Sequence, residues 1–137
     1  MIEPYIEVDK IVVDKGELTH TKKDGWIEYT VGVLEQSGEY RALKPSITVA
    51  ENSVLSLEEK FQGGTGINIT PPPSDILPAE HRVKLRQAVE KTAKALGIQN
   101  YARIDCFYNA DKGQTVIIEA NSLPGMTPST VIYHQAL

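Results

Sequence analysis

The 137-residue sequence has little of several features that mark common classes of protein. It holds one cysteine, Cys106, so no disulfide can form within the chain, and this usage fits a reducing cytosol. No stretch approaches the roughly 20 apolar residues that a membrane-spanning helix requires, and the first residues lack the basic start and apolar run of a signal peptide. These shortages favour a cytoplasmic protein over a secreted or membrane protein.

Basic residues are in the minority. The chain has 14 Lys and Arg residues against 18 Asp and Glu residues, a net charge of −4, and its cations are scattered. This balance does not favour binding to nucleic acid or to an anionic membrane surface. Because 41% of the residues are hydrophobic, a chain of this length can still bury the core of one domain. An acidic domain that bound a nucleotide would need a few well-placed cations and metal ions to hold the phosphates.

Several familiar kinds of catalytic site also lack support. The histidines His20, His81 and His134 lie far apart, and none has a metal-binding spacing such as His-x-x-x-His. Cys106 has no base beside it in the sequence, so a covalent nucleophile is not indicated. The glycine-rich run at 63–66 has neither the spacing nor the following Lys-Ser/Thr of a Walker motif, and we interpret it as a flexible loop.

The sequence pattern predicts an α+β organisation (α/β in the broad sense), with a largely antiparallel sheet flanked by helices. Apolar and polar residues alternate from Trp26 to Leu34, which is typical of a half-buried strand. Asp14–Glu17 is a hairpin signal between two short apolar runs. Further strands are expected at 40–49, 102–108 and 115–121, a long loop at 50–76, and a second helix from about Pro128.

A long helix is predicted from Pro78 to Leu96. Its apolar face is formed by residues at spacings of three and four, which are Leu85, Ala88, Val89, Thr92 and Leu96. Pro78 suits the first turn of a helix, and Gly97 follows the last periodic residue, as a C-cap should.

Polar residues with catalytic potential occur on two consecutive predicted strands. Arg103 and Asp105 point to one face of the first strand, because side chains alternate, and Glu119 and Asn121 do the same on the second. If the turn between them folds into a hairpin, these four side chains converge on one side of the sheet. The residues expected on the other side are Ile104, Cys106 and Ile118.

Two carboxylates and an amide oxygen that face one another repel unless a positive charge lies between them. Hard divalent cations suit such an oxygen set, and Mg²⁺ typically takes one or two carboxylates together with water and substrate phosphates. The alternative interpretation is a solvated polar face on an amphipathic hairpin. It becomes less favourable when Arg103, Asp105, Glu119 and Asn121 are considered together, with apolar residues between them.

The two strands carry Ala-Arg-Ile-Asp at 102–105 and Ile-Glu-Ala-Asn-Ser-Leu-Pro-Gly-Met-Thr at 118–127, and this pattern resembles the signature of the D-alanine–D-alanine ligase family. The resemblance implies that two Mg²⁺ ions, or Mn²⁺, bind Asp105, Glu119 and Asn121, with Glu119 bridging. It assigns catalytic roles at the phosphate and the developing oxyanion to Arg103 and the Gly125 N–H. It also implies a substrate-carboxylate loop that includes Thr130 and Val131, where the family usually has serine and leucine.

The same resemblance implies a nucleotide site along the rest of the chain. The expected ATP-binding residues are Glu3, Tyr5 and Ile6 along the adenine edge, Glu28 on the ribose hydroxyls, Lys60 on a phosphate, and Phe107 and Ile118 on the two faces of adenine. Phe61 stands where the family usually has a tyrosine, so any hydrogen bond from that phenol is absent. Residues 8–26 depart from the family pattern and are predicted to form an inserted β-hairpin.

The resemblance extends from residue 3 to about 131 but corresponds to only the last part of the family's length. It implies that residues 1–137 are the carboxy-terminal domain of an ATP-grasp ligase. The amino-terminal and central domains of the same protein, which are not in this sequence, would be the domain's partners. A homodimer of the intact protein is compatible with the family.

The implied activity is ATP-dependent ligation of two D-alanine molecules through an acyl phosphate, for peptidoglycan synthesis. The domain by itself is expected to turn over no substrate, because both halves of an ATP-grasp site must position the phosphates. Two alternatives remain open. One is another ATP-grasp ligase that joins a carboxylate to an amine or a hydroxy acid, and the other is a nucleotide-binding module without catalysis.

Overall fold

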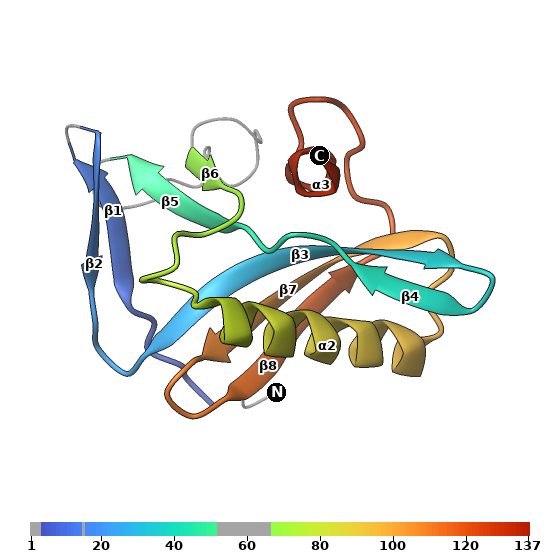
Figure 1. Ribbon diagram of the computed structural model, residues 1–137, viewed down its shortest axis with the longest axis horizontal. Coiled ribbons are helices and arrows are strands. Elements are labelled where there is room, and N and C mark those ends of the chain that lie inside the picture. The colour runs from blue at the N-terminus through green and yellow to red at the C-terminus, as the bar shows by residue number, and fades with distance from the viewer. Residues whose placement is uncertain (1–3, 15, 52–66) are drawn as a thin grey trace.

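The computed structural model describes residues 4–14, 16–51 and 67–137 and has an α+β fold. The β-strands are β1 (Lys10–Asp14), β2 (Glu17–Thr21), β3 (Trp26–Gln36), β4 (Glu39–Ala42), β5 (Ile47–Glu51), β6 (Ile67–Ile69), β7 (Tyr101–Asn109) and β8 (Gln114–Asn121). The helices are α2 (Ala79–Leu96) and α3 (Val131–Ala136). The predicted fold class, a largely antiparallel sheet flanked by helices, is confirmed (Figure 1).

The main sheet has the strand order β4-β3-β7-β8, and each neighbouring pair is antiparallel. Its core face is formed by alternate residues of β3 and β7, including Val31, Val33, Ile104 and Cys106, all fully buried. Because β3 alternates apolar and polar residues, its apolar residues face the core and its polar residues lie on the opposite face. The predicted strands at 26–34, 102–108 and 115–121 are therefore confirmed.

Helix α2 covers the apolar face of this sheet (Figure 1). Leu85, Val89 and Ala93 are the buried residues of the helix, and Gly97 ends it in the left-handed conformation with φ 65°. The predicted helix is confirmed, but Leu96 is 58% exposed because it lies in the last turn, outside the buried face. No helix in the described part of the chain combines the length and apolar character needed to cross a bilayer.

The second sheet has the order β2-β1-β5-β6. Strands β1 and β2 form the predicted antiparallel hairpin, and β1 also pairs with β5 in parallel, which the sequence pattern did not predict. The single strand expected at 40–49 is wrong, because the chain divides into β4 and β5 at Lys44-Pro45 and the two strands join different sheets. The loop expected at 50–76 also contains the three-residue strand β6.

A buried carboxylate organises the base of the hairpin. Asp9 accepts hydrogen bonds of 2.9 Å from the backbone N–H groups of Lys23 and Gly25, and His20 Nε2 lies 2.9 Å from its other oxygen. Since a carboxylate can only accept, this nitrogen of His20 carries the proton. Burial by itself raises the pKa of Asp9, but the hydrogen bonds from Lys23, His20 and Gly25 outweigh it and lower the pKa below the usual range.

The hairpin is also tied to the turn between β7 and β8. Asn109 Nδ2 donates 2.8 Å to the carbonyl of Asp24, and Lys22 pairs with Asp111 at 2.6 Å. Lys112 Nζ lies 5.5 Å from the centre of the Trp26 ring. These contacts place the hairpin at the end of the main sheet where the β7–β8 turn lies, as Figure 1 shows.

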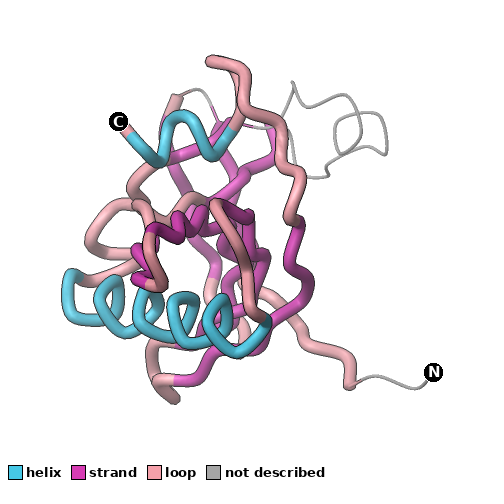
Figure 2. The backbone as a smooth tube through the Cα atoms, turned by 90° about the vertical axis from the view of Figure 1, so that its right-hand side faces the viewer, coloured by secondary structure: helices cyan, strands magenta, loops and turns pink. Residues whose placement is uncertain are grey.

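Helix α3 lies on the opposite face of the main sheet from α2 (Figures 1 and 2). It begins at Val131, three residues after the expected start at Pro128, because residues 127–130 form a turn closed by a 2.9 Å hydrogen bond from Thr130 N–H to Thr127 O. The sheet is therefore covered by α2 on its apolar face and by α3 on the face that carries the polar side chains.

Candidate active site

The polar residues predicted to converge do so on the face opposite α2. Asp105 pairs directly with Glu119, and Arg103 pairs directly with Asn121, so all four side chains start from the same side of β7 and β8. Arg103 Nη2 lies 3.0 Å from Asp105 Oδ2 and 3.6 Å from Glu119 Oε1. The guanidinium thus lies between two carboxylates and offsets their repulsion.

Thr30 belongs to the same cluster, and sequence reasoning missed it. It pairs with Asp105 across β3 and β7, and its Oγ1 donates a hydrogen bond of 2.8 Å to Asp105 Oδ1. Asp105 is therefore held through one oxygen by Thr30 and through the other by Arg103. The signal was available, because Thr30 lies on the polar side of the alternating strand 26–34, but the partner strand could not be identified from local sequence.

A β-bulge shifts the pairing of β8 with β7 by one residue beside this cluster. Asp105 pairs with Glu119 while Cys106 pairs with Ile117, so Ile118 has no partner of its own on β7. Ile118 was expected on the side of Ile104 and Cys106, and it is 45% exposed while the other two are fully buried. Bulges of this kind often lie next to active sites, where they redirect a side chain.

An apolar strip adjoins the charged cluster on the same face of the sheet. Phe107 lies two residues beyond Asp105 on β7 and pairs with Glu28 on β3 and with Val116 on β8. Val116 and Ile118 are both exposed, and Phe107 is half-buried. Along its length the face therefore changes from Arg103 and Asp105 to Phe107 and Val116, with Glu28 beside Phe107.

The oxygen atoms of Asp105, Glu119 and Asn121 are of the kind that Mg²⁺ prefers. The described residues contain no group of three His, Cys, Asp or Glu side chains that could hold a metal ion, but the predicted set here is two carboxylates and an amide. Asp105 and Glu119 provide the one or two carboxylates that Mg²⁺ usually takes. Arg103 Nε is buried without a hydrogen-bond partner in the described structure, whereas Arg103 Nη2 is the atom that lies close to the two carboxylates.

The segment after β8 is a tight loop that leads into α3. Asn121 Oδ1 accepts a 2.9 Å hydrogen bond from Leu123 N–H, and Thr130 Oγ1 donates 2.7 Å to Thr127 O. A Cβ atom added at Gly125 would lie 2.9 Å from Thr130 Cγ2, which is closer than side chains tolerate. A side chain at position 125 would therefore require Thr130 to shift. Val131 follows as the first residue of α3.

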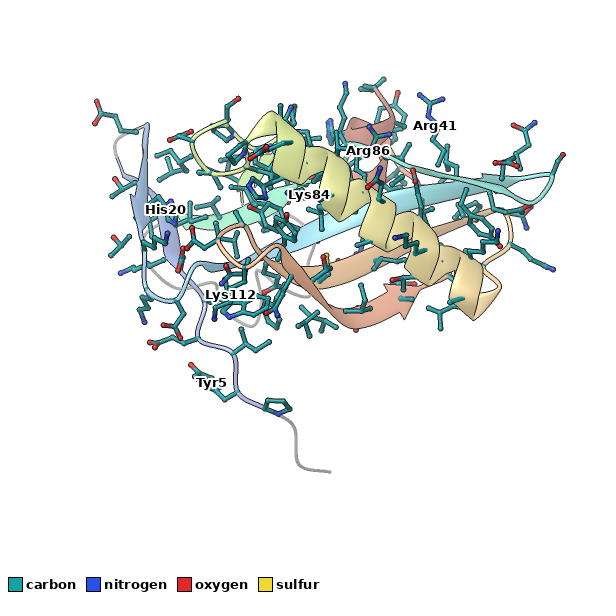
Figure 3. The ribbon with its side chains drawn as sticks, turned by 60° about the horizontal axis from the view of Figure 1, so that its bottom comes forward. Tyr5, His20, Arg41, Lys84, Arg86 and Lys112 are labelled. Atoms are coloured by element: carbon teal, nitrogen blue, oxygen red, sulfur yellow. The ribbon has the colours of Figure 1, made fainter. Side chains whose placement is uncertain are left out.

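Other predicted site residues are placed differently. Tyr5 is 90% exposed, and it lies in the N-terminal segment that extends away from the rest of the protein (Figure 3). Ile6 follows in the same segment, half-buried, and neither residue belongs to a strand. Glu3 and Lys60, with Phe61 and the glycine run at 63–66, lie outside the described residues. The structure thus brings together the residues of β3, β7 and β8, whereas the N-terminal segment is joined to the 22–26 region through Glu7, which pairs with Lys23 at 2.6 Å, and through Val8, which bridges to Trp26.

Cys106 is an unsuitable nucleophile. Burial raises the pKa of its thiol to about 12, so the thiol stays protonated at neutral pH. Its Sγ lies 3.6 Å from the carbonyl of Tyr29, on the apolar side of the sheet.

The fold is that of an ATP-grasp domain, with a charged cluster on the α3 side of an antiparallel sheet. The family model described as D-ala D-ala ligase C-terminus matches residues 10–136. The chain belongs to the D-alanine–D-alanine ligase family, and it corresponds to the carboxy-terminal part.

Individual relatives agree with this assignment. The chain is 35% identical over 104 residues to the D-alanine–D-alanine ligase of Halalkalibacterium halodurans, covering 76% of this chain and 33% of that protein. It is 33% identical over 142 residues to the ligase of Pediococcus pentosaceus, covering 93% of this chain and 38% of the relative. The solved structure of the Bacillus anthracis ligase complexed with ATP has 22% identity and a TM-score of 0.56, covering 86% of this chain and 34% of that one. The chain thus spans about a third of the length of these relatives.

Proposed function

We propose that this chain is the carboxy-terminal ATP-grasp domain of an ATP-dependent D-alanine–D-alanine ligase of the cytoplasm. The observation that carries the proposal is the cluster of Arg103, Asp105 and Glu119, supported by Thr30, at one end of the face that continues to Phe107. It has the carboxylates for a divalent cation, a guanidinium for a phosphate and an apolar strip for a base. The sequence similarity to the named ligases supports the choice of reaction.

The nucleotide would lie along the face from β8 and β7 to β3. Phe107 and Ile118 would contact the adenine, and Glu28, which pairs with Phe107 across the sheet, would accept from the ribose hydroxyls. Glu3, Tyr5, Ile6 and Lys60 complete the nucleotide site by resemblance to the family. With the base at Phe107, the triphosphate would extend toward Asp105 and Arg103, which lie two and four residues away on the same face.

Asp105, Glu119 and Asn121 would hold two Mg²⁺ ions, which neutralise phosphate charge when bound. Thr30 and Arg103 fix the carboxylate of Asp105, so its orientation is set before a nucleotide arrives. Asn121 Oδ1 accepts a hydrogen bond from Leu123 N–H. As a metal ligand, this oxygen would either give up that hydrogen bond or keep it while it also binds the cation.

The reaction would proceed in two steps. The γ-phosphoryl group of ATP passes to the carboxylate of the first D-alanine, and the amine of the second D-alanine then displaces phosphate from the acyl phosphate. Arg103 and the Gly125 N–H would stabilise the tetrahedral oxyanion, because charge that develops on oxygen is best met by preorganised donors. Thr130 and Val131 would hold the carboxylate of the second D-alanine. The product would be D-alanyl-D-alanine for peptidoglycan.

The chain alone is expected to hold only half of this site. In the full-length protein, the amino-terminal and central domains would enclose ATP and D-alanine together with this domain. The same site would form in a monomer or in a homodimer of the full-length protein. Phosphoryl transfer depends mainly on positioning, so a single half should produce no measurable ligation. Appreciable ligase activity of the purified 137-residue chain would contradict this expectation.

The proposal is tested by phosphate release from the full-length protein with ATP, Mg²⁺ and D-alanine. Asp105→Asn and Glu119→Gln are expected to lower the rate at least about 100-fold, because each removes a carboxylate that holds cations across the phosphates. Glu39→Gln, which neutralises an exposed carboxylate on β4, is the matched control and should retain the wild-type rate. Full activity of Asp105→Asn and Glu119→Gln would refute the assignment of the cluster.

A further inference from the structure

Gln135, near the end of α3, is a polar residue with an unusually complete set of buried hydrogen bonds. Its side chain is 1% exposed. Its Oε1 accepts a hydrogen bond of 2.6 Å from Gly32 N–H, and its Nε2 donates 2.7 Å to the Thr30 carbonyl and 3.0 Å to Ser46 Oγ. Both ends of the carboxamide are therefore paired, and two of the three partners are backbone groups of β3.

The carboxamide occupies a gap in the pairing along the edge of β3. Strand β4 pairs with β3 up to Ala42, Leu43 N–H still donates to the Gly32 carbonyl, and Ser46 bonds to both backbone groups of Thr30. Between these points Lys44-Pro45 leaves the strand, so Gly32 N–H has no backbone acceptor there. The side-chain amide of Gln135 takes the place of the missing peptide group. The backbone N–H of Lys44 in turn donates to the backbone carbonyl of Gln135 at 3.4 Å.

Gly32 has no side chain, and Gln135 occupies the space where a Cβ atom would lie. A Cβ atom at Gly32 would lie 2.8 Å from Gln135 Oε1, 2.9 Å from Ile132 Cγ1 and 2.9 Å from Leu43 Cδ1. These distances are shorter than real Cβ contacts, so a side chain at position 32 would displace Gln135, Ile132 or Leu43 from the backbone of β3. Glycine in the middle of a strand is otherwise unfavourable, which indicates that this close approach matters.

The backbone groups that Gln135 binds belong to the residues beside the charged cluster. Gly32 pairs with Arg103 and Thr30 pairs with Asp105, and Thr30 itself donates to the Asp105 carboxylate. At its other end α3 begins directly after the 122–130 loop, which contains Gly125 and Thr130. Gln135 therefore connects the helix that ends this loop to the strand that orients Asp105.

We infer that Gln135 is a positioning residue that locks α3, and with it the 122–130 loop, onto β3 beside the Arg103 cluster. It touches no reacting atom in this role. The inference deepens the proposed function and rests on it for its kinetic consequence, since the loop is where the acceptor D-alanine would bind. Without the lock, α3 loses its hydrogen-bonded anchor to Thr30 and Gly32, and the loop before it can shift relative to the cluster.

The test compares Gln135→Met, which removes both ends of the amide at similar length, with Arg86→Met in the full-length protein. Arg86 donates from α2 to the Ala42 carbonyl, so its loss disturbs β4 from the other face of the sheet and controls for general destabilisation. Gln135→Met is expected to raise the KM for the acceptor D-alanine about tenfold, equivalent to about 1.4 kcal/mol, and to change the KM for ATP less than about twofold. Arg86→Met should leave both KM values near wild type.

Hydrogen exchange provides a reading that does not depend on activity. In Gln135→Met the amide of Gly32 and the amides of 122–131 should exchange faster, while those of α2 remain protected; Arg86→Met should leave the 122–131 amides unchanged. Unaltered exchange in 122–131, or an acceptor KM that changes equally in Arg86→Met, would overturn the role of Gln135. A wild-type protein that releases no phosphate with any acceptor would refute the proposed function, and the exchange comparison would still decide the role of Gln135.

Discussion

Removing the Asp9 carboxylate should destabilise the hairpin end of the protein by a predictable amount. In Asp9→Ala the backbone N–H groups of Lys23 and Gly25 lose their acceptor, and His20 loses its partner. The Asp9 side chain is only 1% exposed, so water cannot easily replace it. A buried donor left unpaired costs about 1–3 kcal/mol, so the two N–H groups together predict a loss of about 2–6 kcal/mol.

Urea unfolding followed by the fluorescence of Trp26, the only tryptophan, would measure this loss. Asp24→Ala, which removes an exposed carboxylate in the same loop, is the matched control and should change the free energy of unfolding by less than about 0.5 kcal/mol. Equal stabilities of Asp9→Ala and Asp24→Ala would refute the reasoning.

The pH dependence of the same free energy follows from the lowered pKa of Asp9. A carboxyl whose pKa is depressed by folding contributes stability that is fully present above its unfolded pKa, about 3.9, and is lost as the pH falls through the lower folded value. The part of the difference between wild type and Asp9→Ala that comes from ionisation of Asp9 should therefore be present at about pH 5 and should shrink below about pH 4. A difference that grows as the pH falls below about 4 would contradict the assignment of the shift to Asp9.

Three further predictions follow from other contacts. Thr30→Val, which removes the 2.8 Å hydrogen bond to Asp105 at nearly constant volume, should lower kcat of the full-length protein about 10- to 100-fold and raise the Mg²⁺ concentration needed for half-maximal rate. Gly125→Ala should lower ligation measured by phosphate release, because the new methyl group meets Thr130 Cγ2 at 2.9 Å and displaces the loop; retention of the wild-type rate would show that the loop tolerates the shift. Leu85→Ala, at a fully buried site between α2 and the sheet, should cost about 2–5 kcal/mol in urea unfolding, and a loss below about 1 kcal/mol would show that the helix packs differently.

Much of the fold could be predicted because its signals are local. The alternation in β3, the spacing of apolar residues in α2 and the turn between β1 and β2 each fall within a short window of sequence. The juxtaposition of Arg103, Asp105, Glu119 and Asn121 also followed from local alternation, since their strands are neighbours in sequence and pair as a hairpin.

Two contacts that the sequence did not predict join residues far apart in the chain. Thr30 meets Asp105 across 75 positions, and Gln135 reaches Gly32 across 103, so no periodicity within one element reveals either contact. The bulge at Ile118 is a difference of one residue in the pairing of two strands, which alternation alone cannot detect. Pro45 is a local signal that residues 40–49 do not form one strand, because proline has no backbone N–H to donate to a neighbouring strand.

Direct identification of the product tests the central claim most simply. The full-length protein would be incubated with ATP, Mg²⁺ and either D-alanine or L-alanine, and the dipeptide would be detected by mass spectrometry, with D-lactate as a third acceptor and the 137-residue chain alone as a control. The account predicts D-alanyl-D-alanine from D-alanine, little product from L-alanine and none from the isolated chain. Release of phosphate without any dipeptide, or equal products from both alanine isomers, would contradict the proposed D-alanine–D-alanine ligase activity.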